Sequence, residues 1–328
     1  MRLIGKVLEV LRKRGMHFWF EPVESLNLGL CRILFFGALF LLYLDYDVTR
    51  WTEVSDSLWM PVWIFQILHL PILSSSLLVV LQSVWKMSLA LSCIGLFTRV
   101  STVSSFILGT YLLGLPMNFG KVTHAEGLVV FVVGIMALSR CGDSCSIDRL
   151  IWKARQRNDT SRQRLQVSGE YTWPVRAVWL MFALIFFAAG VSKLRHSGLE
   201  WILSDNMAIL LLKAQFEGKS AVPWGFFLAQ HQWLTQLVAA AAIAVEVGYP
   251  LALFSRRARW ILVPGAFSML IGINLLMGPN FRLFLICNLF WVRWDCVAYR
   301  FGRGFRRLLS LRKRLLTTTK NPSKQDAV

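Results

Sequence analysis

The sequence predicts an all-α protein, a polytopic transmembrane helical bundle of about eight spans with one or two further helices at the membrane interface. The first observation is composition, because 55% of the 328 residues are hydrophobic and only 16% are charged. The second is length, because a helix needs about 20 mostly apolar residues to cross the hydrocarbon core, and the chain offers eight such runs. This composition excludes an ordinary soluble enzyme.

The expected spans are the long apolar runs of the chain. They cover residues 28–45, 77–97, 102–118, 125–139, 174–194, 233–254, 260–278 and 281–297. The run at 125–139 is short for a span and needs an untilted helix or a locally thinner bilayer. Two other apolar stretches, 58–73 and 202–216, are interrupted by proline or charged residues. They suit interfacial or re-entrant helices.

The third observation is how the positive charge is distributed. The chain has 36 Lys+Arg against 18 Asp+Glu, and the dense basic clusters lie at 1–17, 140–164, 256–259 and in the tail from 300. With eight spans, all four clusters fall on one side, which the positive-inside rule makes cytoplasmic. We therefore expect a multi-pass membrane protein with both termini in the cytoplasm.

The same distribution divides the chain and limits its partners. We expect a basic cytoplasmic segment at 1–19, a transmembrane domain at 20–298 and a basic cytoplasmic tail at 299–328. The apolar stretch after the N-terminal segment lacks a small-residue cleavage site, so it is expected to stay as the first span. Basic flanks explain the net charge without nucleic acid, which is not an expected partner. Membrane lipids are expected partners, because the basic tail can lie on anionic headgroups.

Five ionisable residues fall inside or at the ends of the spans: Arg32, Lys86, Glu126, Lys193 and Glu246. Each costs about 2.5–3.5 kcal/mol to insert at a helix centre, so each needs a reason. For Arg32 and Lys86 we expect structural pairing, for example with Glu246. Small residues before Glu246 allow another helix to approach closely. We expect Glu246 to face the bundle interior toward Arg32, Lys86 or Lys193.

Lys193 and His124 are expected at the same, extracytoplasmic end, because the fifth span ends at Lys193 and the fourth begins at His124. A lysine at the end of an apolar helix loses hydration, which favours the neutral amine, and a neutral amine can act as a base. The imidazole could then donate or orient a hydrogen bond. The structural alternatives are a snorkelling lysine and an interfacial histidine hydrogen bond.

The cysteines and the other histidines suggest no further chemistry. The spacing of Cys141 and Cys145 is neither that of a redox pair nor that of a zinc pair. We expect a turn and a helix start there, with Ser146 or Asp148 as caps. The remaining histidines show no metal-ligand spacing, so no metal site is expected.

Several short motifs, taken in order, resemble the HTTM family, the membrane domain shared with vitamin K-dependent gamma-carboxylase. These motifs are LFTR at 96–99, GKVTHAE at 120–126, ALSRCGD at 137–143, SID at 146–148, AGVSKL at 189–194 and VEVGYPL at 245–251. The resemblance runs from about Phe20 to about Trp294. It implies a helical membrane domain over 20–298.

In the carboxylase branch, the resemblance implies a reduced quinone cofactor, like vitamin K hydroquinone, that a lysine deprotonates with help from a histidine. The corresponding residues here are Lys193 and His124, with Glu246 as an orienting carboxylate. We expect no large extracytoplasmic domain after the spans, where a basic tail follows, and 260–278 contains no histidine where carboxylase relatives place one. In its length and in the expected absence of that domain the chain is similar to a shorter bacterial branch, which includes proteins needed to mature a secreted peptide toxin. This resemblance implies a bacterial plasma membrane.

Two functions therefore remain open from the sequence. One is a membrane enzyme, carboxylase-like or an oxidoreductase, that uses a quinone-like lipid with Lys193, His124 and Glu246 at its site. The other is a non-catalytic membrane factor for maturation, export or immunity of a secreted peptide, in which the same residues only tie helices together. A secreted peptide or protein is the expected partner or substrate. Transport is less favoured, because no inverted repeat is visible.

Overall fold

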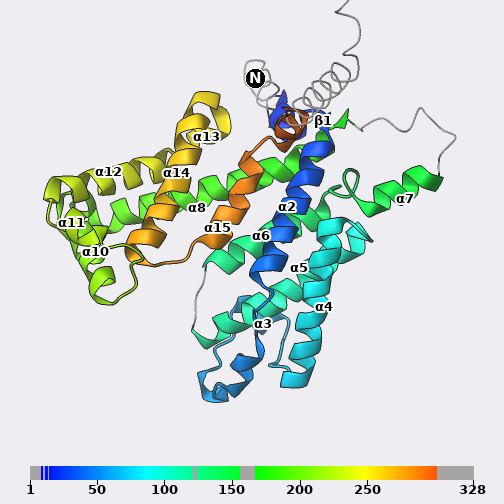
Figure 1. Cartoon of the computed structure of the whole chain (residues 1–328), viewed down its shortest axis with the longest axis horizontal. Coiled ribbons are helices and arrows are strands. Elements are labelled where there is room, and N and C mark those ends of the chain that lie inside the picture. The colour runs from blue at the N-terminus through cyan, green and yellow to red at the C-terminus, as the bar shows by residue number, and fades with distance from the viewer. Residues whose placement is uncertain (1–8, 10–11, 14, 121–123, 156–166, 301–328) are drawn as a thin grey trace, which may run out of the picture. The chain divides into compact units, whose positions relative to one another are not determined.

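The structure is a computed structural model that describes residues 9, 12–13, 15–120, 124–155 and 167–300, without the side chains of Asp56 and His124. The described part is almost entirely helical, as the sequence predicts (Figure 1). Its two strands, β1 (Val23–Glu24) and β2 (Val167–Ser168), form one antiparallel pair with Val23 opposite Ser168.

The helices of the first half pack in sequence order, α2 on α4, α4 on α5 and α5 on α6. Their bounds are α2 (Leu26–Leu42), α3 (Trp63–Ile67), α4 (Ser75–Ile94), α5 (Thr98–Gly114), α6 (His124–Leu138) and α7 (Ile147–Arg155), with 3₁₀ turns η1 (Thr49–Glu53), η2 (Asp56–Leu58) and η3 (Leu115–Phe119). Gly95 ends α4 in the left-handed conformation, with φ 70°, which only glycine adopts without strain.

In the second half of the chain, α8 packs against α12, and α14 packs against α10, α12 and α13. Their bounds are α8 (Trp173–Ser197), α9 (Glu200–Leu203), α10 (Asn206–Phe216), α11 (Trp224–Ala229), α12 (Gln232–Gly248), α13 (Leu251–Phe254), α14 (Arg256–Met277) and α15 (Arg282–Cys287), with 3₁₀ turns η5 (Gly169–Tyr171) and η6 (Asn288–Trp291). Ser255 caps α14 by accepting a 3.3 Å hydrogen bond from the amide of Ala258.

Every expected span coincides at least in part with helix, but the count of eight crossings is not confirmed. Among the described residues, four helical stretches are long and apolar enough to cross a membrane, namely 75–94, 98–119, 169–197 and 256–277. Five further apolar helices in this part of the chain have 10–17 residues. The last expected span, 281–297, is a continuous apolar helix only over Arg282–Trp291. Ten residues extend about 15 Å, half of a typical hydrocarbon core.

The outer surface of the described helices is apolar, as a lipid-facing surface requires. Phe254, Trp260 and Ile261 are 80%, 72% and 72% exposed. The interior combines large apolar side chains with hydroxyl side chains, for example Ser88 and Ser105, whose Oγ atoms lie 2.8 Å apart between α4 and α5. Small residues and hydroxyl groups are typical of helix contacts in membranes.

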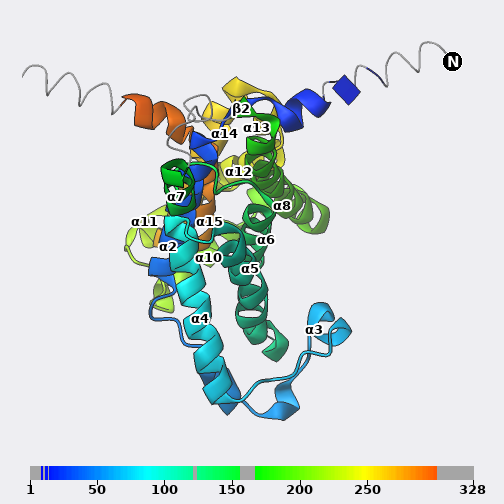
Figure 2. The same cartoon turned by 90° about the vertical axis from the view of Figure 1, so that its right-hand side faces the viewer.

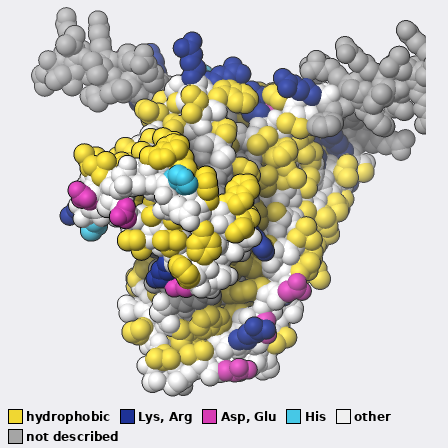
Figure 3. Space-filling model, turned by 60° about the vertical axis from the view of Figure 1, so that its left-hand side comes forward, with side chains coloured by type: hydrophobic (Ala, Val, Ile, Leu, Met, Phe, Trp, Pro, Cys, Tyr) yellow, Lys and Arg dark blue, Asp and Glu magenta, His cyan; other side chains and the backbone are white. Residues whose placement is uncertain are grey.

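Within the unit Met1–Trp291, the described basic clusters meet at one end of the bundle, which we call the basic end. The guanidinium of Arg176 binds Glu21 at 2.9 Å, and that of Arg259 lies 4.3 Å from the ring centre of Trp179 in α8. Arg140 binds Glu170 at 2.8 Å. Figure 2 shows β2, α7 and α13 at this end and α3 away from it, and Figure 3 shows several Lys and Arg side chains at this end, with others elsewhere on the same face.

The segment Val292–Val328 forms a separate unit. In its described part, residues 294–300 are helical. Arg293 lies just before that helix and Asp295 lies in its first turn, and the two form an ion pair of 2.7 Å.

Candidate functional site

The site is built where α8 and α12 approach each other closely. Gly190 in α8 makes this approach possible, because a Cβ at this position would lie 2.9 Å from Cβ of Glu246 and 2.9 Å from Cγ2 of Val247. Real Cβ atoms are not found so close to other heavy atoms. One turn further along α8, Lys193 faces the same part of α12.

Lys193 donates a hydrogen bond from Nζ to Oε1 of Glu246, so an ion pair joins α8 to α12. The carboxylate side chain is 5% exposed and the lysine side chain is 27% exposed. The second carboxylate oxygen, Oε2 of Glu246, is buried and has no hydrogen-bond partner among the described residues. The expectation that Glu246 faces the interior toward a cation is confirmed, and the cation is Lys193.

Trp201 in α9 completes the surroundings of the lysine. Nζ of Lys193 lies 5.4 Å from the centre of the Trp201 ring, within the range of a cation–π interaction. The indole Nε1 of Trp201 is also buried without a partner among the described residues. The site therefore combines a cation, a carboxylate, an aromatic face and two buried polar atoms with unused hydrogen-bonding capacity.

The structure describes the backbone of His124 but not its side chain, so a pocket shared by Lys193 and His124 stays a prediction. The backbone of His124 begins α6, and α6 packs against α8. Glu126, in the first turn of α6, has a buried Oε2 with no described partner.

The other two cations of the spans do not pair with Glu246, and that part of the expectation is wrong. The fully buried Arg32 donates to carbonyl oxygens instead, at 2.5 Å to Ser92, 2.8 Å to Cys93, 2.6 Å to Cys145 and 3.2 Å to Cys141. The last carbonyls of a helix have no partner within that helix, and a guanidinium can satisfy several of them. Lys86 similarly donates to the carbonyls of Leu44 and Tyr46.

The loop between α6 and α7 forms the expected turn and helix start. Oγ of Ser146 accepts a 3.0 Å hydrogen bond from the amide of Arg149, and so caps α7. Asp148 instead caps α5 by accepting from the amides of Phe97 (2.9 Å) and Thr98 (2.7 Å). Burial acts to raise the pKa of Asp148, but these hydrogen bonds outweigh it and lower the pKa below its ordinary value.

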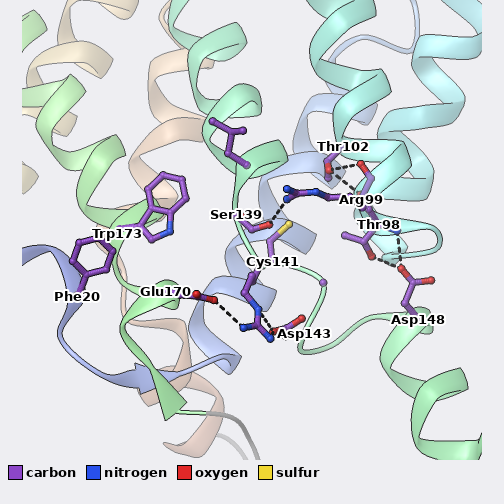
Figure 4. Close-up of a pocket in the computed structure, with 13 residues that line it drawn as sticks. Phe20, Thr98, Arg99, Thr102, Ser139, Cys141, Asp143, Asp148, Glu170 and Trp173 are labelled. Carbon is purple, nitrogen blue, oxygen red and sulfur yellow. Dashed lines mark hydrogen bonds and ion pairs between the residues drawn. The ribbon is translucent and has the colours of Figure 1, made fainter.

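A second feature, which the sequence did not reveal, is a pocket of about 600 Å³ at the basic end (Figure 4). It lies between the start of α5, the end of α6 and the segment that leads into α8. Polar side chains line one part of it and apolar side chains another. Most of its lining comes from the motifs at 96–99, 137–143 and 146–148, but no one of these motifs indicates that they meet around a pocket.

Among the described residues, no three His, Cys, Asp or Glu side chains gather in a way that could hold a metal ion. No family model, no curated protein and no solved structure matches this chain.

Proposed function

We propose that this chain is a membrane enzyme of the HTTM type that acts with a reduced quinone-like lipid, with Lys193 as the base. The observation that supports this most is the Lys193–Glu246 ion pair, located on apolar helices, where Oε2 of Glu246 and Nε1 of Trp201 are buried without a hydrogen-bond partner among the described residues. An ionisable pair inside a membrane is costly to maintain, and such pairs commonly mark proton or substrate pathways.

In this proposal the pair exchanges a proton internally. A proton that moves from Nζ of Lys193 to Glu246 leaves two neutral groups in contact. Lys193 is then a free amine that can take a proton from an acidic hydroxyl. Glu246 stores the first proton and keeps the amine in place, which is the orienting role expected of it.

The surroundings fit the ring of a quinol. Oε2 of Glu246 can accept a hydrogen bond and Nε1 of Trp201 can donate one, and both atoms are buried without a described partner. The Trp201 ring offers a flat face on which an aromatic ring can stack. When bound, a quinol would supply an acidic hydroxyl and reducing equivalents. We propose that His124 assists, because it begins α6, and α6 packs against α8, which carries Lys193.

The proposed topology places the basic end in the cytoplasm of a bacterial cell, with both termini there and the chain crossing eight times. The meeting of the basic clusters supports this, because Lys and Arg are enriched in cytoplasmic loops. Within this topology we propose that Lys193 lies toward the extracytoplasmic side, because it lies near the end of α8 that is remote from Trp173.

A second candidate is a non-catalytic membrane factor for maturation, export or immunity of a secreted peptide. The observation that favours it is that Lys193 and Glu246 are in direct contact in this structure, as two residues with a purely structural role would be. In that case Lys193 only holds α8 against α12.

Titration with a short-chain naphthoquinol, followed by tryptophan fluorescence of the purified protein in detergent, separates the two candidates. If the site takes a quinol, the wild type binds it and Lys193→Gln weakens binding at least tenfold, while Lys213→Gln, a change of an exposed lysine, has no effect. The part of the fluorescence change that is absent from a Trp201→Phe variant comes from Trp201 and therefore from the site. Equal quinol affinity in the wild type and Lys193→Gln would contradict the enzyme proposal.

A further inference from the structure

The pocket at the basic end carries an inference that does not depend on the quinone proposal. Figure 4 shows Arg99 from α5 reaching across to Ser139, and Phe20 and Trp173 on the opposite side of the pocket. Its volume of about 600 Å³ is in the range of small-molecule sites, about 300–1,000 Å³.

One side of the pocket offers a cation with unused hydrogen-bonding capacity. Among the described residues, the hydrogen bonds of Arg99 all use Nη1, which donates to the carbonyls of Ala137 at 2.8 Å and Ser139 at 3.2 Å. These bonds fix the guanidinium at the end of α6 and leave its other nitrogens for a ligand. A planar guanidinium is well suited to bind a phosphate.

The adjacent side offers carboxylates. Arg140 joins two of them, because its Nη2 lies 2.8 Å from Asp143 and its Nη1 lies 2.8 Å from Glu170. The side chains of Asp143 and Glu170 remain 27% and 51% exposed, so both can accept further hydrogen bonds. Glu170 raises the pKa of Arg140 by accepting its hydrogen bond, and Asp148 is occupied with the start of α5.

The edge of the pocket is apolar and open. Leu138 is 71% exposed and Phe20 is 44% exposed, and both line the pocket. On a membrane protein, such side chains beside a charged pocket lie where acyl chains join their headgroups. The pocket therefore has the polarity of an amphiphile, with charged groups inside and apolar side chains at the opening.

We propose that this pocket binds the headgroup of a zwitterionic aminophospholipid, with the phosphate at Arg99 and the ammonium at Asp143 and Glu170. The balance of charge favours this headgroup over an anionic one, because three carboxylates and two guanidinium groups line the pocket. A trimethylammonium headgroup is less suitable, because it has no N–H to donate to the carboxylates. The acyl chains leave the pocket past Phe20 and Leu138.

The test is native mass spectrometry of the delipidated protein in detergent, titrated separately with dihexanoyl phosphatidylethanolamine, phosphatidylcholine and phosphatidylglycerol, and with inorganic phosphate. The ethanolamine lipid is expected to bind at least tenfold more tightly than each of the other three. Glu170→Gln removes one ammonium acceptor and should weaken ethanolamine-lipid binding about tenfold while leaving the glycerol lipid unchanged or slightly tighter. Glu200→Gln, a change at an exposed carboxylate outside the pocket, should leave all four affinities unchanged.

Three results would overturn the proposal. The first is glycerol-lipid binding as tight as ethanolamine-lipid binding in the wild type, which would make this an anionic-lipid site. The second is inorganic phosphate binding as tight as the lipid, which would make the lipid irrelevant. The third is a Glu170→Gln protein that is folded, as judged by its melting temperature, and binds the ethanolamine lipid like the wild type.

Discussion

Glu246 binds Lys193 through one carboxylate oxygen and buries the other without a described partner. The two residues are unequal members of the pair, because Glu246 is 5% exposed and Lys193 is 27% exposed. The lysine has a long side chain that can turn toward the interface if its partner is lost. The carboxylate has no such freedom, and this inequality leads to the first prediction.

Lys193→Leu is expected to destabilise the protein more than Glu246→Gln does. Loss of the lysine leaves a buried carboxylate uncompensated, at a cost of about 3–5 kcal/mol, whereas the glutamine keeps a neutral hydrogen-bond acceptor for the lysine. Thermal melts of the purified variants measure the difference. Glu217→Gln, in an exposed pair with Lys219, is the control and should melt like the wild type. Equal melting temperatures for Lys193→Leu and the wild type would exclude a buried pair.

Gly190→Ala is expected to separate α8 from α12 at the site. The added Cβ would lie 2.9 Å from Glu246 and 2.9 Å from Val247, and such overpacking costs about 1–3 kcal/mol. Gly272→Ala in α14 is the matched control, since no atom lies within 4 Å of its added Cβ. That control should be neutral or stabilising by up to about 1 kcal/mol, because alanine is the better helix former. Thermal melts that rank the two variants in the opposite order would show that the close approach is wrong.

Asp148→Asn is expected to destabilise the start of α5 by about 0.5–1.5 kcal/mol at neutral pH, the net contribution of one hydrogen bond, because asparagine keeps only one of the two oxygens that accept from the amides of Phe97 and Thr98. The pKa of Asp148 is lowered in the folded protein. Its stabilising effect is therefore complete above the unfolded-state pKa of about 4 and is lost as the pH falls through the lower folded-state value. The stability difference between the wild type and Asp148→Asn should shrink below about pH 4. Asp45→Asn, at an exposed carboxylate, should show no comparable difference at pH 7.

The proposed topology predicts that Asn158 is cytoplasmic. In a background in which the exposed Cys145 and Cys296 are replaced by serine, Asn158→Cys should react with an impermeant thiol reagent only after the cells are permeabilised. Ser57→Cys, at an exposed position after the first span, should react in intact cells. The reverse labelling pattern would place the basic end outside.

The sequence was sufficient to predict where most helices lie, because apolar runs and capping residues are local signals. Ser146 is an example, since a hydroxyl residue just before a helical segment is a recognisable cap, and the structure confirms it. The pairing of Glu246 was predictable in kind, because a carboxylate on an apolar helix needs a cation. The choice of Lys193 among three cations was not, because it depends on which helices are neighbours.

Other features depend on tertiary contacts that no local pattern records. Arg32 binds carbonyl oxygens from residues 60 to 113 positions away, and carbonyl acceptors exist at every residue, so the sequence does not mark them. The pairing of β1 with β2 joins Val23 to Ser168, and two-residue strands have no detectable alternation. The pocket at the basic end was missed for the same reason.

The most direct test of the central claim is lipid analysis of the protein purified from its native membrane. The claim is that Lys193, held by Glu246, is the base at a site for a quinone-like lipid. Solvent extraction followed by chromatography should recover close to one quinone per wild-type protein, and less than a tenth of that from Lys193→Gln, with Lys213→Gln retaining the wild-type amount. If the wild type and Lys193→Gln carry the same amount of quinone, or if neither carries any, the Lys193–Glu246 pair is not a quinone site.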